Sequence, residues 1–384
     1  MSKTPLLILS DSISCSSGLG RISRDLAIRL HQNCSDVFEV ATAGYGGPGD
    51  IFPFPEFHLH SVDKWLVPEL PVIWERFVGN RDGIIFVVWD ASRLYWLTNP
   101  DQCPIPFLSQ WLKAVRPKMK IWLYGAIDAE GPNGKLTHRI ADIYKGFDRV
   151  LDYSAFSCAI TGTKDHLPHG IDPTIFNPKD RLAAKKAFRE GGFTTLNDDS
   201  LLIGIVATNQ ARKDWALGME AASILLKRGH DVKLWCHTDV MERHWNIPSL
   251  VVDFGLEGRA AVTTSRFTDE QMCWMTSACD LTMAIGPEGF GFSPAESLAC
   301  RTPVVAGSYG AQAEFVPKSM QVDPIAFRYE GPFSSRRPVY NPAHWAAKAE
   351  KLIGVRCSLP DHINWNGPTL WKEWQSWFLN GVEL

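Results

Sequence analysis

The sequence predicts an α/β protein built from two doubly wound parallel sheets, and three observations lead to this prediction. Short apolar runs alternate with amphipathic helical stretches along the chain, which is the pattern of a parallel sheet with crossover helices. The alternation pauses at a segment rich in proline, glycine and aspartate, residues 167–181, and then starts again, as at a linker between domains. The length of 384 residues is too great for one small core and is consistent with two domains.

In the first half, a strand is expected at 6–12, and a glycine turn and a helix with Leu19, Ile22, Leu26 and Leu30 at helical spacing follow it. Further strands are expected at 83–90, 120–128 and 148–154, whereas the stretch 45–82 matches no pattern. Ligands of such sheets bind beyond the carboxyl ends of the strands. The acidic residues at two of these ends, Asp90 and Asp128, are therefore candidate site residues.

In the second half, the expected strands are 201–208, 231–238, 250–255, 280–286 and 302–307. A helix is expected over 214–229, ending at a glycine C-cap. Another helix should begin at a capping box formed by Thr268 and Gln271. His237 ends one of the strands and is a further candidate for the site.

The composition limits the classes of partner. The chain is 45% apolar and 21% charged, with a net charge of −3, so nucleic acid or anionic membrane would have to be bound by a local patch. Nine cysteines without a Cys-x-x-Cys pair predict neither a zinc site nor a disulfide framework, and they favour a cytoplasmic location. The N-terminus is expected to be a strand rather than a signal peptide, and no apolar run approaches the roughly 20 residues of a membrane span.

The segment PEGFGFSPAESLA, residues 287–299, contains two glutamates that point to a binding site. Glu288 lies in the loop after an apolar strand, beside glycines whose backbone can approach a ligand closely. Glu296 has a structural alternative, because Ser293 at N-cap, Pro294 at N1 and Glu296 at N3 would make a capping box. A helix N-terminus attracts phosphate, and carboxylates accept hydrogen bonds from sugar hydroxyls. The segment therefore predicts a sugar-nucleotide site.

The longer stretch EGFGFSPAESLACRTPVVAGSYGAQAEFV resembles the signature of retaining GT-B glycosyltransferases, especially family 4. That signature has Glu, seven residues, Glu, a small-residue helix, a PVVA strand and a glycine loop ending in Glu, which correspond here to Glu288, Glu296 and Glu314. Three other segments resemble the family at the right places: SSGLGRISRDLA, LPHGIDPTIFNP and GIVATNQARKDWALGMEAASIL.

The resemblance implies two facing Rossmann-like domains with a cleft between them: an acceptor-side domain, 1–170, and a sugar-nucleotide donor domain, 171–355. A C-terminal segment, 356–384, would cross back to the first domain. The implied activity is retaining transfer of a hexose-like sugar from a nucleotide diphosphate sugar to a hydroxyl acceptor. No metal and no cofactor are implied, because this fold holds the diphosphate with protein cations.

The resemblance also implies roles for single residues. Glu288 would contact the donor sugar and Glu296 the ribose. Arg212 and Lys213 match the basic pair that neutralises the leaving diphosphate, and fixed cations in a dry site stabilise such charge. The other residues implied at the donor site are Gly289, Phe290 and Gly291, with Gly18 and Gly20 in the first strand-to-helix turn and His237 as a further candidate.

Two positions depart from the family pattern. Asp128 stands where many members have a histidine, with Glu130 close by, so one of these carboxylates would orient a hydroxyl; as an alternative, Asp128 would be the N-cap of the next helix. Thr208 stands where the usual arginine precedes the lysine, and Arg212 would take over its work. Asp90 and Glu130 are acceptor-side candidates.

The sequence leaves open the sugar, the nucleotide, the oligomeric state and the acceptor, which would be a glycan, a lipid, a small molecule or a DNA base. For DNA, a local basic patch is available from Lys113, Arg116, Lys118, Lys120, Arg336 and Arg337. Two further alternatives are a non-enzymatic sugar-nucleotide binding module and a nucleotide-sugar epimerase on the same fold.

Overall fold

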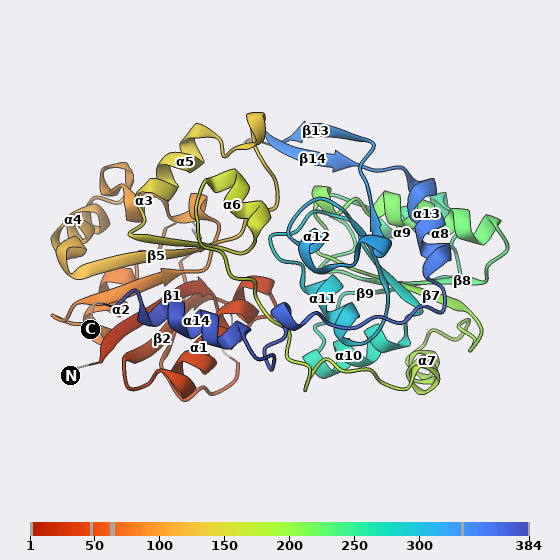
Figure 1. Cartoon of the computed structure of the whole chain (residues 1–384), viewed down its shortest axis with the longest axis horizontal. Helices are drawn as coiled ribbons and strands as arrows, with labels where there is room; N and C mark the ends of the chain where they lie inside the picture. The colour runs from red at the N-terminus through yellow and green to blue at the C-terminus, as the bar shows by residue number, and fades with distance from the viewer. Residues whose placement is uncertain (1–2, 47–48, 62–65, 332–333, 383–384) are drawn as a thin grey trace. The chain divides into compact units, whose positions relative to one another are not determined.

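A computed structural model of the chain describes residues 3–46, 49–61, 66–331 and 334–382. The chain divides into two compact units, one formed by Met1–His169 with Lys372–Leu384 and the other by Gly170–Trp371. Each unit holds a six-stranded sheet in which every strand pairing is parallel, with helices packed around it (Figure 1). The predicted α/β class is confirmed.

The sheet of the first unit has the strand order β3-β2-β1-β4-β5-β6. Its strands are β1 (Thr4–Asp11), β2 (Phe38–Tyr45), β3 (Glu56–Leu59), β4 (Gly83–Val87), β5 (Met119–Gly125) and β6 (Arg149–Asp152). Its helices are α1 (Gly18–Asn33), α2 (Leu70–Phe77), α3 (Tyr95–Thr98), α4 (Pro106–Val115), α5 (His138–Lys145) and α6 (Ala155–Thr161), with short 3-10 turns η1 (Ala91–Leu94), η2 (Pro100–Gln102), η3 (Arg116–Lys118) and η4 (Pro132–Gly134). The central strand β1 is apolar and buried over 6–9, as expected when helices cover both faces.

The last helix, α14 (Leu370–Leu379), packs most of its length on the first unit. Phe378 and Trp374 are fully buried, and the ring of Phe378 lies 5.1 Å from that of Phe86 on β4. Arg149 of β6 donates a hydrogen bond of 2.6 Å to the carbonyl of Trp377 and lies over its ring at 4.1 Å. Aromatic burial thus joins the end of the chain to its first sheet.

The sheet of the second unit has the strand order β12-β11-β10-β7-β8-β9. Its strands are β7 (Leu201–Val206), β8 (Val232–His237), β9 (Ala260–Thr263), β10 (Leu281–Ala284), β11 (Val304–Gly307) and β12 (Gln321–Val322). Its helices are α7 (Arg181–Glu190), α8 (Trp215–Lys227), α9 (Ile247–Asp253), α10 (Asp269–Ala278), α11 (Phe292–Ala299), α12 (Gln312–Phe315) and α13 (Pro342–Leu352), with 3-10 turns η5 (Ala211–Lys213), η6 (Lys318–Met320) and η7 (Asp361–Ile363). Strands β13 (Ala326–Glu330) and β14 (Ser335–Val339) form a separate antiparallel hairpin, the pair of blue arrows in Figure 1.

Some elements differ from the sequence prediction. The strand expected at 250–255 is wrong, because these residues belong to helix α9 and its end. Asn246 caps this helix by accepting a hydrogen bond of 3.0 Å from the backbone of Ser249. A short apolar run fits a strand or a helix equally well by periodicity, and this cap favours the helix. The capping box of Thr268 and Gln271 is confirmed at the start of α10.

The candidate residues after β4 and β5 lie farther from the sheet than predicted. The strands end at Val87 and Gly125, so Asp90 and Asp128 follow in the loops instead of ending the strands. No helix in the described parts of the chain has both the length and the apolarity that crossing a bilayer requires.

Candidate functional site

The basic pair and the first glutamate of the motif meet in the second unit. The Lys213 ammonium forms an ion pair with one carboxylate oxygen of Glu288. The Arg212 guanidinium lies 3.5 Å from the other oxygen and donates a hydrogen bond of 2.7 Å to the carbonyl of Pro287. Strands β7 and β10 are parallel neighbours, so the loops beyond their carboxyl ends lie side by side. Residues predicted from two separate motifs therefore form one cluster.

Burial makes this charge cluster sensitive to its composition. The Lys213 side chain is only 6% exposed, and that of Glu288 is 26% exposed. A buried cation that loses its partner is strongly destabilised. Glu288 therefore has a structural role as the counter-ion of Lys213, and its partly exposed carboxylate leaves the pair accessible at the carboxyl end of the sheet.

Close backbone packing holds the two loops together. A side chain at Gly286 would meet the carbonyl oxygen of Arg212 at 2.6 Å and the side chain of Lys213 at 3.0 Å, so this position must stay a glycine for the loops to approach. Asp214 adopts a left-handed backbone, with φ of 39°, and its carboxylate accepts a hydrogen bond from Leu217 at the start of α8. The close approach at Gly286 and the left-handed backbone at Asp214 therefore fix the direction of the Arg212 and Lys213 side chains.

A buried amide that the sequence did not indicate ties the site together. Gln312 is fully buried, and its side-chain oxygen accepts a hydrogen bond of 2.9 Å from the backbone of Glu288. Its side-chain nitrogen donates to the carbonyls of Gly286 and Tyr309, at 3.2 and 3.0 Å. Gln312 thus positions Glu288 from the glycine loop that follows β11. The sequence offers only one sign of this role, a glutamine next to a glycine loop, and no known motif would have predicted the role from it.

Helix α11 begins differently from the prediction. Its N-cap is Gly291, which has φ of 105° and makes no side-chain cap, so the capping box of Ser293 and Glu296 is wrong. Because glycine adopts a positive φ at little cost, the N-cap falls at Gly291, two residues before Ser293, whose side chain was expected to cap the helix. Glu296 therefore lies inside the helix and is only 7% exposed. The capping explanation for this buried carboxylate is removed.

The other residues of the motif divide between contact with the site and packing. Gly289 stands in the loop after Glu288, in the half-buried stretch that leads to α11. Phe290 is 4% exposed, and its ring packs 5.2 Å from that of Phe292 and 5.4 Å from that of Phe315. This ring anchors the loop in the core.

His237, at the end of β8, is joined to the next strand. Its Nδ1 lies 2.8 Å from the hydroxyl of Thr263, and its ring stacks on Phe267 at 4.9 Å and 11°. Burial lowers the pKa of this imidazole below its usual value, so the neutral ring is favoured. Phe267, its stacking partner, carried no signal in the sequence.

In the first unit, the glycine turn after β1 is built by local contacts. Ser17 caps α1 by accepting from the backbone of Gly20 at 3.0 Å, and its hydroxyl donates to Asp11 at 2.7 Å. A side chain at Gly20 would meet the carbonyl oxygen of Ser12 at 2.4 Å. This glycine is thus required for close packing, whereas Gly18 is the first residue of the helix.

Two carboxylates of the first unit escaped the sequence analysis. Asp11 accepts hydrogen bonds from the indole of Trp89 at 3.0 Å and from Arg93 at 3.4 Å. Glu56 accepts from the hydroxyls of Ser12 at 2.6 Å and Ser14 at 3.2 Å. Glu56 lies in the stretch that matched no pattern, and two of the partners of Asp11, Trp89 and Arg93, come from a distant part of the chain.

The acceptor-side candidates occupy loops. Asp90 is exposed and precedes η1, while Asp128 and Glu130 are half-buried between β5 and η4. The N-caps of the next two helical elements are Gly131 and Thr137. Asp128 therefore caps neither of them, and the alternative that it is the N-cap of the next helix is wrong.

Comparison with known proteins identifies the fold. No protein-family model matches the sequence, and no curated protein matches it. Among solved structures, Anabaena Alr3699/HepE in complex with UDP and glucose has a TM-score of 0.63 at 15% identity, over 91% of this chain and 90% of that one. A glycosyltransferase from Rickettsia africae scores 0.62 at 13% identity, over 92% and 89%. AviGT4, a glycosyltransferase involved in avilamycin A biosynthesis, scores 0.57 at 13% identity, over 99% of both chains.

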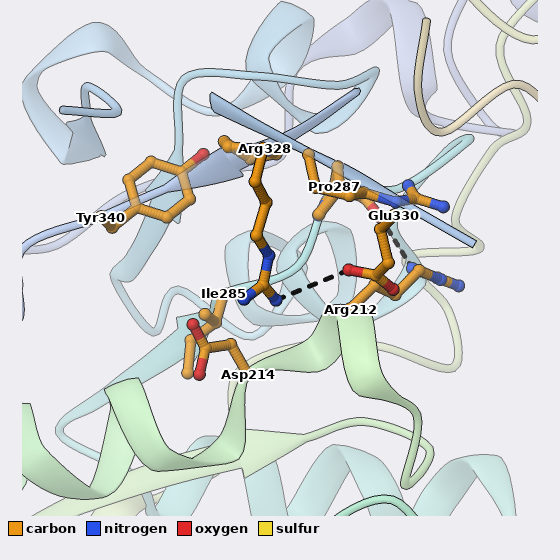
Figure 2. Close-up of a pocket in the computed structure, with 9 residues that line it drawn as sticks. Arg212, Asp214, Ile285, Pro287, Arg328, Glu330 and Tyr340 are labelled. Atoms are coloured by element: carbon orange, nitrogen blue, oxygen red, sulfur yellow. Dashed lines mark hydrogen bonds and ion pairs between the residues drawn. The ribbon is translucent and has the colours of Figure 1, made fainter. Parts of the chain in front are cut away.

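This chain has the GT-B fold. In this GT-B chain, the cluster of Lys213, Arg212 and Glu288 adjoins a pocket of the second unit. Figure 2 shows Arg212, Pro287 and Glu330 on one side of this pocket and Arg328 reaching from the hairpin above Asp214. The described residues that line it are Arg212, Asp214, Ile285, Pro287, Arg328, Glu330, Arg337, Pro338 and Tyr340. Arg212 therefore belongs both to the charge cluster with Lys213 and Glu288 and to the lining of the pocket.

Proposed function

We propose that the protein transfers a sugar from a nucleotide diphosphate sugar to a hydroxyl acceptor. The observation that carries the proposal is the convergence of Lys213, Arg212 and Glu288 at the carboxyl ends of β7 and β10. Cations suit the departing diphosphate, and a carboxylate suits the hydroxyls of the sugar. The HepE structure, of the same fold, was obtained with UDP and glucose, which supports a nucleotide sugar as donor.

The charges explain how the site would act. Breaking the bond between the anomeric carbon and the diphosphate leaves negative charge on the leaving oxygen, while the acceptor oxygen forms the new bond and its proton passes to the departing diphosphate. Lys213 and Arg212, held in place by the loop contacts above, would stabilise that developing charge without reorganising. Glu288 balances the two cations before the donor binds, and the buried Glu296 would accept from the ribose hydroxyls.

Retention at the anomeric carbon and a hexose as the sugar complete the proposal. Both rest on the resemblance of the stretch around Glu288 and Glu296 to retaining enzymes of this fold. Protein cations would replace a divalent metal in holding the diphosphate. Asp128, which caps no helix, would orient an acceptor or sugar hydroxyl.

The test begins with thermal stabilisation of the protein by a panel of nucleotide sugars. The donor that stabilises it is then incubated with candidate acceptors, and NMR reports the anomeric configuration of the product. Transfer with retention is expected. Release of an altered sugar without any acceptor would favour an epimerase, and binding without turnover of any kind would leave only a binding module.

A matched pair of variants links the activity to the site. Lys213→Ala is expected to lower turnover by about a hundredfold or more, the usual effect of losing one electrostatic donor. Lys233→Ala is the control, because Lys233 on β8 is equally buried, at 6% exposed, and belongs to no part of the cluster. Equal turnover in the two variants, once corrected for folded protein, would contradict the proposal.

A further inference from the structure

The hairpin of β13 and β14 brings two arginines together on one face. Arg328 and Arg337 are direct partners in the antiparallel register, so their side chains leave the same face of the hairpin. Both line the pocket that also contains Arg212. Like charges placed directly opposite each other destabilise a hairpin, and an anion between the two would remove that repulsion.

The carboxylates of the pocket do not balance this charge. Among the described residues, the pocket is lined by three arginines and by two acids, Asp214 and Glu330. Adding Lys213 and Glu288, the ion pair next to Arg212, gives four cations and three anions, so one positive charge remains. Glu330 forms an ion pair with Arg328 at 3.5 Å, which Figure 2 marks with a dashed line. Asp214 accepts a hydrogen bond from the backbone of Leu217 at the start of α8, and it also interacts electrostatically with Arg328. The lining is therefore net positive.

The third arginine of the hairpin belongs to the opposite face. Arg336 pairs with Tyr329 in the register, and its guanidinium lies over the ring of Phe327 at 3.9 Å. Two of the three arginines thus gather in a pocket and the third packs on an aromatic ring outside it. This division favours a compact anion over a long polyanion spread along the hairpin.

We propose that Arg328 and Arg337, together with Arg212, form a second anion-binding site that holds a phosphate group of the acceptor. Guanidinium groups bind phosphate through paired hydrogen bonds. Of the two cations assigned to the donor diphosphate, Arg212 lines the pocket and Lys213 does not, so the pocket adjoins the donor phosphates and extends from Arg212 toward the hairpin. The acceptor would then be a phosphate monoester that also carries a free hydroxyl, such as a sugar phosphate. This inference rests on the proposed function.

The test measures phosphate binding while UDP fills the donor site. Inorganic phosphate, a hexose 6-phosphate and the matching neutral hexose are titrated by calorimetry into protein saturated with UDP. The two phosphates are expected to bind the wild type more tightly than the neutral hexose. The double variant Arg328→Gln with Arg337→Gln should lose about tenfold or more of that affinity. Arg336→Gln is the matched control from the other face and should change it by less than about twofold.

Each other outcome has a definite meaning. Loss of UDP affinity in the double variant, in step with loss of phosphate affinity, would place both arginines in the donor site and overturn the inference. If Arg336→Gln lowered the phosphate affinity as much as the double variant does, the inference would be overturned in favour of a general polyanion-binding surface. An equal loss of affinity for a short DNA strand in Arg336→Gln and in the double variant would have the same meaning. Failure of UDP to bind the wild type would show that the donor carries another nucleotide, and the titration would then use the diphosphate of the nucleotide sugar that stabilises the protein. Failure of every nucleotide sugar in the panel would count against the proposed function alone, and the phosphate titration without nucleotide would still decide this inference. Absence of phosphate binding to a wild type that binds UDP would refute it.

Discussion

At the scale of single residues, the site is decided by which charged groups are buried and what they contact. Glu296 is buried inside α11 without a capping role, and Lys213 is buried against Glu288. Burial of ionised groups is unfavourable unless they are paired or used. These positions are therefore the ones where a conservative substitution separates a structural role from a functional one.

Glu296→Gln keeps the size of the side chain and removes its charge. We expect affinity for the donor nucleotide to fall by about tenfold, because hydrogen bonds to a charged acceptor are stronger than those to a neutral one. The melting temperature should hardly change, since the helix does not use this residue as a cap. Calorimetry with UDP measures the affinity, and Glu270→Gln, at an exposed position of α10, controls for the loss of one negative charge. Unchanged affinity would exclude a role in binding the nucleotide.

Asp128→Asn should lower turnover by about tenfold or more while the donor still binds, because a charged group that orients a hydroxyl acts mainly as transfer proceeds. The substitution should not destabilise the fold, since Asp128 caps no helix. Steady-state rates over a range of donor concentrations separate the two effects. Glu130→Gln is the comparison, and a larger loss there would transfer the role to Glu130.

His237 makes the stability of the fold depend on pH. Burial lowers the pKa of its imidazole in the folded state, so as the pH falls through the ordinary value of about 6.5 the unfolded chain binds a proton that the folded chain does not. The free energy of unfolding therefore decreases on acidification and levels off below the folded pKa. Urea denaturation of the wild type and of His237→Gln, between about pH 7 and about pH 5, should show a weaker pH dependence for the variant. Parallel curves would contradict this assignment.

At the scale of elements, the loops at the ends of β7, β10 and β11 are held by glycines and one amide. Gly291 starts α11 from a positive φ, and a side chain there would meet Pro294 at 3.0 Å and Gln312 at 3.2 Å. Gly255, after α9, also has a positive φ but has open space around it. Substitutions at Gly291 and Gly255 therefore share the backbone strain, but only the one at Gly291 also crowds the site.

Gly291→Ala should cost more stability than Gly255→Ala. Both variants incur the strain of a left-handed backbone, about 1–2 kcal/mol, but only Gly291→Ala also displaces the neighbours of Glu288. Urea denaturation measures the stability, and UDP binding should weaken in Gly291→Ala alone. Equal effects of the two substitutions on UDP binding would show that the loop does not position the site.

The elements that sequence analysis predicted correctly are those with local signals. The cap at Thr268 and the glycine-rich turn before α1 were found because the residues that decide them are within a few positions of one another. Helix α9 was missed because a short apolar run fits both kinds of element. Gln312 was missed because two of its three hydrogen bonds, to Gly286 and Glu288, reach a loop far away in sequence. The pairing of Lys213 with Glu288 was not predicted, because it depends on the sheet order that places β7 beside β10.

At the scale of the whole molecule, the restart of the strand and helix pattern predicted two units, and the chain divides at 169–170. The return of the last residues to the first unit came from the resemblance, because no periodicity shows where a terminal helix packs. Its basis in the structure is aromatic contact: Phe378 is fully buried against Phe86 and Trp122.

Phe378→Ala should therefore destabilise the first unit by about 3–5 kcal/mol, the usual cost of removing a buried aromatic ring. Hydrogen exchange should accelerate in β4 and β5 and remain nearly unchanged in β7 and β8. Phe107→Ala, at a ring that is 55% exposed on α4, is the control and should have little effect. Uniform acceleration in both units would show that they unfold as one.

The packing of α14 on the first sheet also has a consequence for synthesis. A ribosome releases the N-terminal part of a chain first, and domains generally fold as they emerge. Here the unit that begins with β1 contains Lys372–Leu384, so it stays incomplete while all of Gly170–Trp371 is translated. During that interval the apolar surface around Phe86 and Trp122 lacks its cover and is open to chaperones or to aggregation. A stop codon just before the codon of Lys372 would therefore leave the unit that begins with β1 incomplete, although Gly170–Trp371 would be translated in full.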